Sequence, residues 1–245
     1  MSTIHEGHRK RVRERFRSEG LEAFAPHEVL ELLLFYGRAR GDTNGLAHER
    51  LARFGSLRGV LEASAEQLAE VGGVGEETAT LLSLAVPLFR RYQLCLCEER
   101  KRISSTREAE EWCAALLAGL RSERFYLISL SAGGRVLGSR LIAEGTLSEV
   151  PAYPRRCVEA ALSHNAHSVL LCHNHPGGAC SPSQADLDAT RLMQRLLRDI
   201  GISLLDHIIV ADGDTYSFAG HGLLREEPPR AGDADKTRRA AAKRE

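Results

Sequence analysis

Two histidines in the C-terminal half have the spacing of a metal-binding pair. His173 and His175 directly follow the apolar run SVLLC (168–172), which is typical of a buried strand. Because side chains two residues apart in an extended chain point to the same side, both imidazoles can face one ion. Imidazole is a good ligand for zinc. Pro176 and two glycines then break the strand and let the chain turn.

A carboxylate follows at a distance that suits a third ligand. The sequence Ser181-Pro182-Ser183-Gln184 predicts a helix start, with Ser181 as the N-cap and Pro182 at the first helical position. In that register Ser183 and Asp186 lie three residues apart on one helical face, and Asp186 can supply the third ligand. Three protein ligands leave a fourth tetrahedral position for water, which is the arrangement of a catalytic zinc site.

Each half of this pattern also has a plainer explanation. A His-x-His pair alone is more often a pair of polar loop residues, and Ser-x-x-Asp is more often ordinary helix capping. Together, in a strand–turn–helix setting, the two halves favour a metal site. His207, in the apolar segment LLDHIIV, is either a further partner of that site or, more often, a strand histidine with its own hydrogen bonds satisfied.

The segments around the site predict an α/β domain over residues 106–224. Helices are expected at 106–120, 154–166 and 181–201, and strands at 125–130, 136–143, 168–172 and 202–211, with a short last strand after them. Strands that alternate with helices are typical of a layered α/β fold.

The N-terminal part predicts a separate all-helical domain. Residues 1–93 contain dense apolar helical patterns and no segment typical of a strand. Short helices are expected around a glycine cluster at 72–75. The charged segment 94–105 is the predicted linker between the domains. The charged tail 225–245, which is poor in large apolar groups, is predicted to be disordered.

The overall composition indicates where in the cell the protein is expected, but it does not indicate whether it binds nucleic acid. Lysine plus arginine and aspartate plus glutamate each number 33, so net charge argues neither for nor against a nucleic-acid partner. No apolar run approaches the roughly 20 residues of a membrane span, and the N-terminus lacks the apolar stretch of a secretory signal. Six dispersed cysteines suit free thiols in a reducing compartment. We therefore expect a cytoplasmic protein without a membrane partner; no pattern indicates an oligomeric state.

The metal-binding pattern is similar to a known family motif. His173-x-His175-Pro176, followed after six residues by Ser183-x-x-Asp186, resembles the JAMM (MPN-plus) zinc-protease motif. More narrowly, the chain resembles the RadC family from about residue 8 to residue 224. The matching segments include HRKRVRERF, HEVLELLLFYGRARGDTN, LARFGSLRGVLEA, HNHPGGACSPSQAD and LDHIIVADGDTYSFAGHGLL.

This resemblance implies a zinc-dependent metallohydrolase, a peptidase or isopeptidase with an unidentified peptide or isopeptide substrate. His173, His175 and Asp186 match the family's zinc ligands. Ser183 matches the residue that steadies the oxyanion, directly or through water. Glu123, just before the first predicted strand, matches the general acid/base, although a glutamate between two arginines is otherwise an ordinary surface charge.

Residues 68–82, LAEVGGVGEETATLL, resemble a helix-hairpin-helix motif with its hairpin at Gly73, Val74 and Gly75. Glycines let the backbone approach a phosphate closely, and the N-terminus of the following helix favours an anion. The motif therefore indicates sequence-independent DNA binding, although it also mediates protein contacts and the two glutamates after the hairpin repel phosphate. The alternative function is a DNA-binding repair factor whose zinc domain is structural or acts on nucleic acid.

Overall fold

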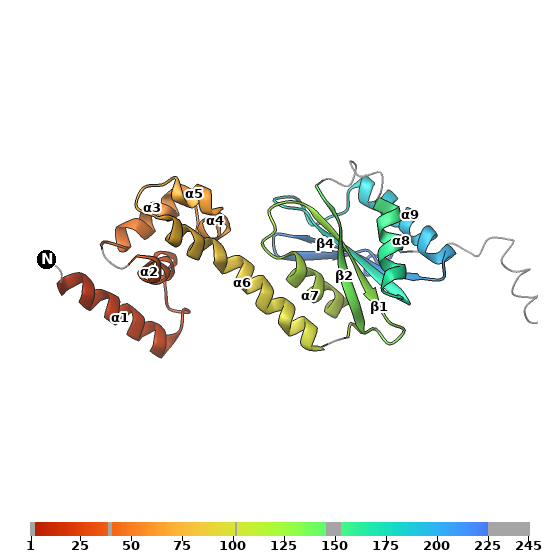
Figure 1. Cartoon of the computed structure of the whole chain (residues 1–245), viewed down its shortest axis with the longest axis horizontal. Coiled ribbons are helices and arrows are strands. Elements are labelled where there is room, and N and C mark those ends of the chain that lie inside the picture. Colours follow the sequence, from red (N-terminus) through yellow and green to blue (C-terminus); the bar gives the residue numbers. More distant parts are fainter. Residues whose placement is uncertain (1–2, 39–40, 101, 146–152, 225–245) are drawn as a thin grey trace, which may run out of the picture. The chain divides into compact units, whose positions relative to one another are not determined.

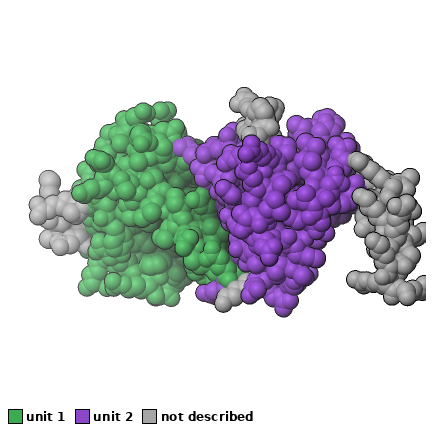
Figure 2. All heavy atoms as spheres, turned by 45° about the vertical axis from the view of Figure 1, so that its right-hand side comes forward, with its two compact units in different colours: residues 1–98 green, residues 99–245 purple. Residues whose placement is uncertain are grey.

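The computed structural model describes residues 3–38, 41–100, 102–145 and 153–224. The chain divides into two units, Met1–Glu98 and Glu99–Glu245, which are coloured separately in Figure 2. The tail predicted to be disordered, 225–245, lies outside the described residues. Within them, no helix has both the length and the apolar composition needed to cross a membrane.

The first unit is all-helical, as the sequence predicts. Its helices are α1 (Thr3–Glu19), α2 (Pro26–Gly37), α3 (Asn44–Phe54), α4 (Leu57–Glu62), α5 (Ala65–Ala69) and α6 (Glu76–Arg100). Side-chain caps mark two of these starts: the Ser56 hydroxyl accepts a hydrogen bond from the Gly59 N–H, and Ser64 forms a capping box with Gln67. Helices α2 to α6 together bury one apolar cluster.

Helix α6 is longer than expected. It continues from Glu76 through Pro87 to Arg100, so the first part of the predicted linker at 94–105 is helical. Leucine, glutamate and arginine, which dominate this stretch, are good helix formers, and its glutamates are exposed on the helix surface. The boundary between the two units, after Glu98, nevertheless falls inside the predicted linker.

The second unit is a mixed β-sheet with helices on both faces, which confirms the predicted α/β class (Figure 1). In spatial order the strands are β2 (Val136–Glu144), β1 (Arg124–Leu130), β3 (Ser168–Asn174), β4 (Ser203–Ala211) and β5 (Asp214–Ser217). Strands β3 and β4 are parallel, and the other neighbouring pairs are antiparallel. Helix α7 (Thr106–Leu117) covers one face, and α8 (Tyr153–Ser163) and α9 (Gln184–Asp199) cover the other.

Strand β3 lies at the centre of the sheet and is buried over its whole length. It pairs with β1 on one side and with β4 on the other, and helices cover both of its faces. Burial on both faces explains why its sequence is a continuous apolar run without alternation. Its C-terminal end carries His173, which lies between Phe125 of β1 and Ile209 of β4. The best-buried strand of the unit thus positions the first candidate ligand.

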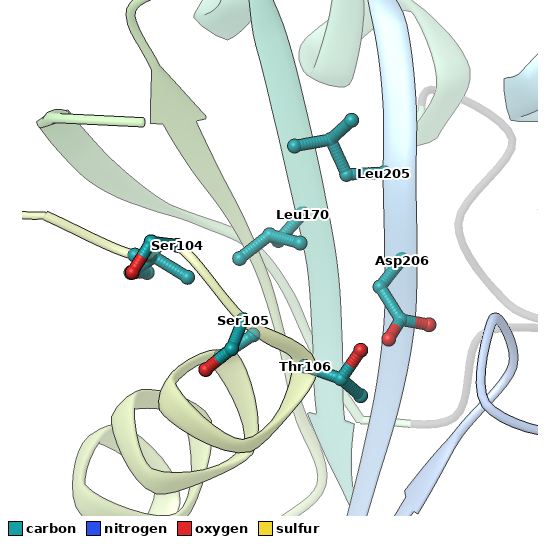
Figure 3. Close-up of a pocket in the computed structure, with 8 residues that line it drawn as sticks. Ser104, Ser105, Thr106, Leu170, Leu205 and Asp206 are labelled. Carbon is teal, nitrogen blue, oxygen red and sulfur yellow. The ribbon is translucent and has the colours of Figure 1, made fainter. Parts of the chain in front are cut away.

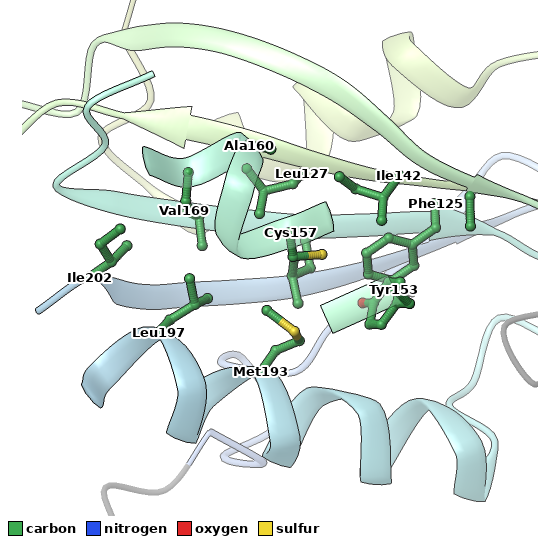
Figure 4. Close-up of a cluster of buried hydrophobic side chains, with 13 residues drawn as sticks. Phe125, Leu127, Ile142, Tyr153, Cys157, Ala160, Val169, Met193, Leu197 and Ile202 are labelled. Atoms are coloured by element: carbon green, nitrogen blue, oxygen red, sulfur yellow. The ribbon is translucent and has the colours of Figure 1, made fainter. Parts of the chain in front are cut away.

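Apolar side chains from the sheet, α8 and α9 form the main core of this unit (Figure 4). Leu127 of β1 and Val169 of β3 share this cluster with Cys157 of α8 and with Met193 and Leu197 of α9, and all five are buried. Helix α9 is therefore held against the sheet by its apolar face, with its N-terminal turn beyond the core.

Leu197→Ala should lower the free energy of unfolding by about 2–5 kcal/mol, because its side chain is fully buried in this core. Leu192, on the same helix but 36% exposed, is the matched control, and Leu192→Ala should change stability by less than about 0.5 kcal/mol. Urea denaturation of both variants measures the difference. Equal losses of stability in the two variants would contradict the burial of Leu197 between α9 and the sheet.

Candidate metal centre

The C-terminal end of β3 brings His173 and His175 to the same side of the sheet. Their Nε2 atoms lie 2.9 Å apart. The His173 side chain is fully buried, whereas 20% of the His175 side chain is exposed. The His175 N–H donates to the Val210 carbonyl (2.9 Å), which extends the pairing with β4 beyond the end of the strand. The common orientation expected of the two imidazoles is therefore observed.

The first turn of α9 adds the carboxylate. Asp186 is 2% exposed, with Oδ1 3.1 Å from His173 Nε2 and Oδ2 3.6 Å from His175 Nε2. With metal–ligand bonds of about 2.0–2.2 Å, the ligand atoms of a tetrahedral zinc site lie roughly 3.3 Å apart. The three observed separations bracket this value. The three side chains thus have the spacing needed to hold one ion between them.

Hydrogen bonds on the far side of each imidazole leave its Nε2 available to a metal. His175 Nδ1 lies 3.0 Å from the Ala179 carbonyl, which can only accept, so this nitrogen carries the proton. His173 Nδ1 lies 2.9 Å from His207 Nε2. Metal-binding histidines almost always donate their second ring N–H in this way. The donor set of two imidazole nitrogens and one carboxylate oxygen therefore fits a zinc ion.

The surroundings of Asp186 favour its ionised form. Burial opposes ionisation, but the neighbouring imidazoles of His173 and His175 and the hydrogen bonds from Ser183 outweigh it and hold the pKa of Asp186 far below its ordinary value. Asp186 in turn raises the pKa of His175, against the effect of burial, because the protonated imidazole can donate from Nε2 to this carboxylate. A carboxylate that stays ionised is available to a cation over the whole physiological pH range.

Glu123 lies at the same end of the sheet, one residue before β1. Because Phe125 of β1 pairs with His173, extending that register by two residues places Glu123 opposite His175 and on the same face. Its carboxylate interacts electrostatically with both histidines and with Asp186. Burial is the main cause that raises the pKa of Glu123, which makes this carboxylate a stronger base than an exposed glutamate.

Asn174, between the two histidines, holds the segment that carries Glu123. It is 4% exposed, and its Oδ1 accepts a hydrogen bond from the Arg124 N–H (2.8 Å). Its Nδ2 donates to the carbonyls of Ser122 (3.0 Å) and Leu120 (3.3 Å). Sequence reasoning missed this residue because its partners are distant in the chain. The one available signal was a polar amide between two ligands at the end of an apolar strand.

The start of α9 differs from the predicted register. The helix begins at Gln184, so Ser183 is the N-cap and Ser181 is not. The Ser183 hydroxyl accepts a hydrogen bond from the Asp186 N–H (3.2 Å) and donates to Asp186 Oδ2 (2.6 Å), while the Ser183 N–H donates to the same oxygen (2.8 Å). The prediction that Ser181 caps the helix, with Pro182 at its first position, is therefore wrong. Both serines are good caps by type, and the capping box with Asp186 decides between them.

Comparison with known proteins identifies both parts of the chain. The family model of the RadC-like JAB domain matches residues 103–223, and the UPF0758 N-terminal model matches residues 5–80. A UPF0758 protein of Ruegeria pomeroyi is 37% identical over 217 residues, which cover 89% of this chain and 97% of the relative. A UPF0758 protein of Cupriavidus pinatubonensis is 36% identical, over 88% of this chain and 95% of the relative. A UPF0758 protein of Saccharophagus degradans is 34% identical, over 88% of this chain and 96% of the relative. The chain belongs to the UPF0758 (RadC) family.

The candidate ligands, Glu123 and Asn174 all lie within the RadC-like JAB domain of this family member. The family resemblance that the sequence motifs indicated is therefore confirmed, and so is the order of a helical region followed by a JAB-type α/β domain. The matches cover nearly the whole length of the relatives, so the two parts occur together in those proteins as well.

The JAB-type unit also contains a cavity away from the candidate metal centre, and Figure 3 shows the residues that line it. It has a volume of about 290 Å³ and lies at the start of α7, where its lining includes Ser104, Ser105, Thr106, Leu170, Leu205 and Asp206. Leu170 and His173 are three residues apart in β3 and so point to opposite faces of the sheet. The residues that line the cavity include none of the three candidate ligands.

The predicted DNA-binding residues lie in the loop between α5 and α6. Gly73 has a φ of 88°, which favours glycine, and both Gly73 and Gly75 are exposed. Val74 instead packs in the core of the first unit. Arg38 donates a hydrogen bond to the Gly73 carbonyl, and the buried Arg50 donates to the carbonyls just before it. The loop thus exposes glycine backbone, while Val74 has a packing role.

Ser183→Ala should lower the free energy of unfolding by about 1 kcal/mol, because α9 loses its N-cap. Ser181→Ala is the matched control two residues earlier and should change stability by less than about 0.5 kcal/mol. Ser183→Ala should also weaken zinc binding, since the Ser183 hydroxyl holds Asp186 Oδ2. Denaturation of the metal-free variants and zinc titration measure these effects. A larger stability loss from Ser181→Ala would show that Ser181 is the cap after all.

Proposed function

We propose that this chain is a zinc-dependent metallohydrolase that cleaves an amide bond, as a metallopeptidase or an isopeptidase. The observation that carries the proposal is the convergence of His173, His175 and Asp186 on one point, with Glu123 close by. Two imidazoles and a carboxylate, with a second carboxylate beside them, form a residue set typical of zinc hydrolases. Membership of the RadC-like JAB domain family supports the same class.

Zinc is the ion that best suits these ligands. Imidazole nitrogen and carboxylate oxygen are both zinc ligands, and the separations between these atoms in the structure are near those of a tetrahedral site. When bound, zinc lowers the pKa of water from ~15.7 to about 7 and polarises a carbonyl group. Three protein ligands are the number found in catalytic sites, where structural sites usually have four.

Glu123 acts as general base and then as general acid. One of its carboxylate oxygens takes a proton from the attacking water and later delivers that proton to the leaving nitrogen. The raised pKa of Glu123 suits both steps. Asn174 holds the backbone around Glu123, and Ser183 holds the carboxylate of Asp186. Stabilisation of the oxyanion by Ser183 rests on the family resemblance alone, because its hydroxyl already bonds to Asp186.

A peptide or isopeptide is the proposed substrate, because the site motif resembles that of the JAMM zinc proteases. The proposed location is the cytoplasm. All six cysteines are free thiols, which is what a reducing compartment favours.

Glu123→Gln should abolish hydrolysis while the protein still binds about one zinc ion per chain. Glutamine keeps the shape of glutamate but cannot accept the proton. His175→Ala removes a ligand and should lose most of the zinc. Metal analysis of the purified proteins, together with cleavage assays on a panel of peptides and isopeptides, measures both effects. If Glu123→Gln loses as much zinc as His175→Ala, Glu123 is a ligand and its role as acid/base is wrong.

DNA binding by the first unit is a second candidate function. The exposed glycines before α6, and the N-terminus of that long helix, offer backbone N–H groups to a phosphate. Glu76 and Glu77 in its first turn oppose an anion. These observations support weak and sequence-independent binding. A repair factor whose zinc domain is structural or acts on nucleic acid would use the loop in this way.

DNA affinity should be on the order of micromolar or weaker and should fall steeply with salt, because phosphate contacts release counterions. Gly75→Asp should weaken binding several-fold, since it adds a negative charge where the surrounding space is open. Ala132→Asp, in an exposed turn of the second unit, adds the same charge elsewhere and should have no effect. Fluorescence anisotropy of the full chain with duplex DNA compares the two. If the two substitutions change DNA affinity equally, the loop of the first unit is not the DNA-binding site.

A further inference from the structure

His207 on β4 is fully buried behind His173. Its Nε2 lies 2.9 Å from His173 Nδ1, and its Nδ1 lies 2.6 Å from the Thr190 hydroxyl. Phe218 stacks on the imidazole with ring centroids 4.7 Å apart, and Phe125 meets it edge to face at 5.5 Å. The ring therefore has one polar partner at each nitrogen and two aromatic neighbours that hold its plane.

The Thr190 hydroxyl fixes the direction in which these hydrogen bonds point. It bonds to the main-chain carbonyl of Asp186, one helical turn back, and a carbonyl can only accept. Because the hydroxyl proton is used there, the Thr190 oxygen accepts from His207 Nδ1–H. A neutral His207 then has no proton on Nε2, so this nitrogen accepts from His173 Nδ1–H.

This direction determines which nitrogen of His173 faces the metal centre with a lone pair. A neutral imidazole carries a single proton, so a proton on Nδ1 leaves Nε2 unprotonated. His173 Nε2 is the atom that faces His175 and Asp186. The chain of hydrogen bonds from the Asp186 carbonyl through Thr190 and His207 therefore prepares His173 as a ligand. It also connects β3, β4 and α9, and two of these elements carry ligands.

We infer that His207 and Thr190 are positioning residues that fix the tautomer and the orientation of His173 for zinc. The inference rests on the proposed function, because it takes His173 as a zinc ligand. Removing such a partner of a ligand histidine typically lowers metal affinity 10–100-fold. If His207 had only a structural role, an apolar side chain could fill the space beside Phe125 and Phe218, and zinc affinity would not change.

Zinc affinity of full-length variants, measured by competition with a chromophoric chelator, tests the inference. Thr190→Val keeps the shape of the side chain but lets His207 adopt either tautomer, so zinc should bind roughly 10-fold more weakly. Thr190→Ser keeps the hydroxyl and should bind zinc as the parent does. His207→Leu removes the acceptor and should weaken binding roughly 10–100-fold. Thermal melts of the metal-free proteins show whether each variant folds. If His207→Leu does not fold, the comparison of Thr190→Val with Thr190→Ser still tests the inference.

Nuclear magnetic resonance of the zinc-loaded parent, with ¹⁵N-labelled histidine, gives a second readout. We expect a proton on His173 Nδ1 and the metal on Nε2. Parent-like zinc affinity in folded Thr190→Val, or a metal bound through His173 Nδ1, would overturn the inference. A parent that binds zinc but cleaves no amide bond would instead overturn the proposed function and leave the roles of His207 and Thr190 in place.

Discussion

A histidine buried at the centre of a sheet needs a partner for each ring nitrogen, and the way His173 meets this need creates the site. A buried polar group left unpaired costs about 1–3 kcal/mol. Nδ1 donates to His207 of β4, while the lone pair of Nε2 faces His175 and Asp186, so that a cation between the three side chains would be its partner. The parallel neighbour of β3 supplies the hydrogen-bond partner, and the turn after β3 with the start of α9 supplies the other candidate ligands. One imidazole thus depends on both the strand pairing and the helix start.

Much of this arrangement could be predicted because short-range geometry dictates it. The two-residue period of an extended chain places His173 and His175 on one side, where the structure has them. A continuous apolar run predicts a strand buried on both faces, and β3 is such a strand. Asp186 follows soon after a turn, so a helix that starts at either nearby serine brings it back to the histidines. Glu123 was indicated by the family resemblance and not by spacing, and the antiparallel pairing of β1 with β3 places it at the same end of the sheet.

The remaining features depend on choices that the local sequence leaves open. Ser181 and Ser183 are equally good caps by residue type, and only the hydrogen bonds to Asp186 in the folded chain show which of them begins α9. His207 meets His173 because β4 pairs in parallel with β3, a contact that no spacing in the sequence specifies. The charged residues at the end of α6 suit a linker and an exposed helix surface equally well, so composition could not predict where that helix ends.

Asp186 couples the start of α9 to the candidate metal centre. It is the third residue of the helix and completes the capping box with Ser183, while the neighbouring histidines, with a smaller contribution from Ser183, keep its carboxylate ionised. The rest of α9 is held by an apolar core that it shares with the sheet and α8. A structural zinc site supplies the folding energy of its domain, whereas this unit buries a core of its own. An open coordination position for chemistry at the candidate site is therefore compatible with the stability of this fold.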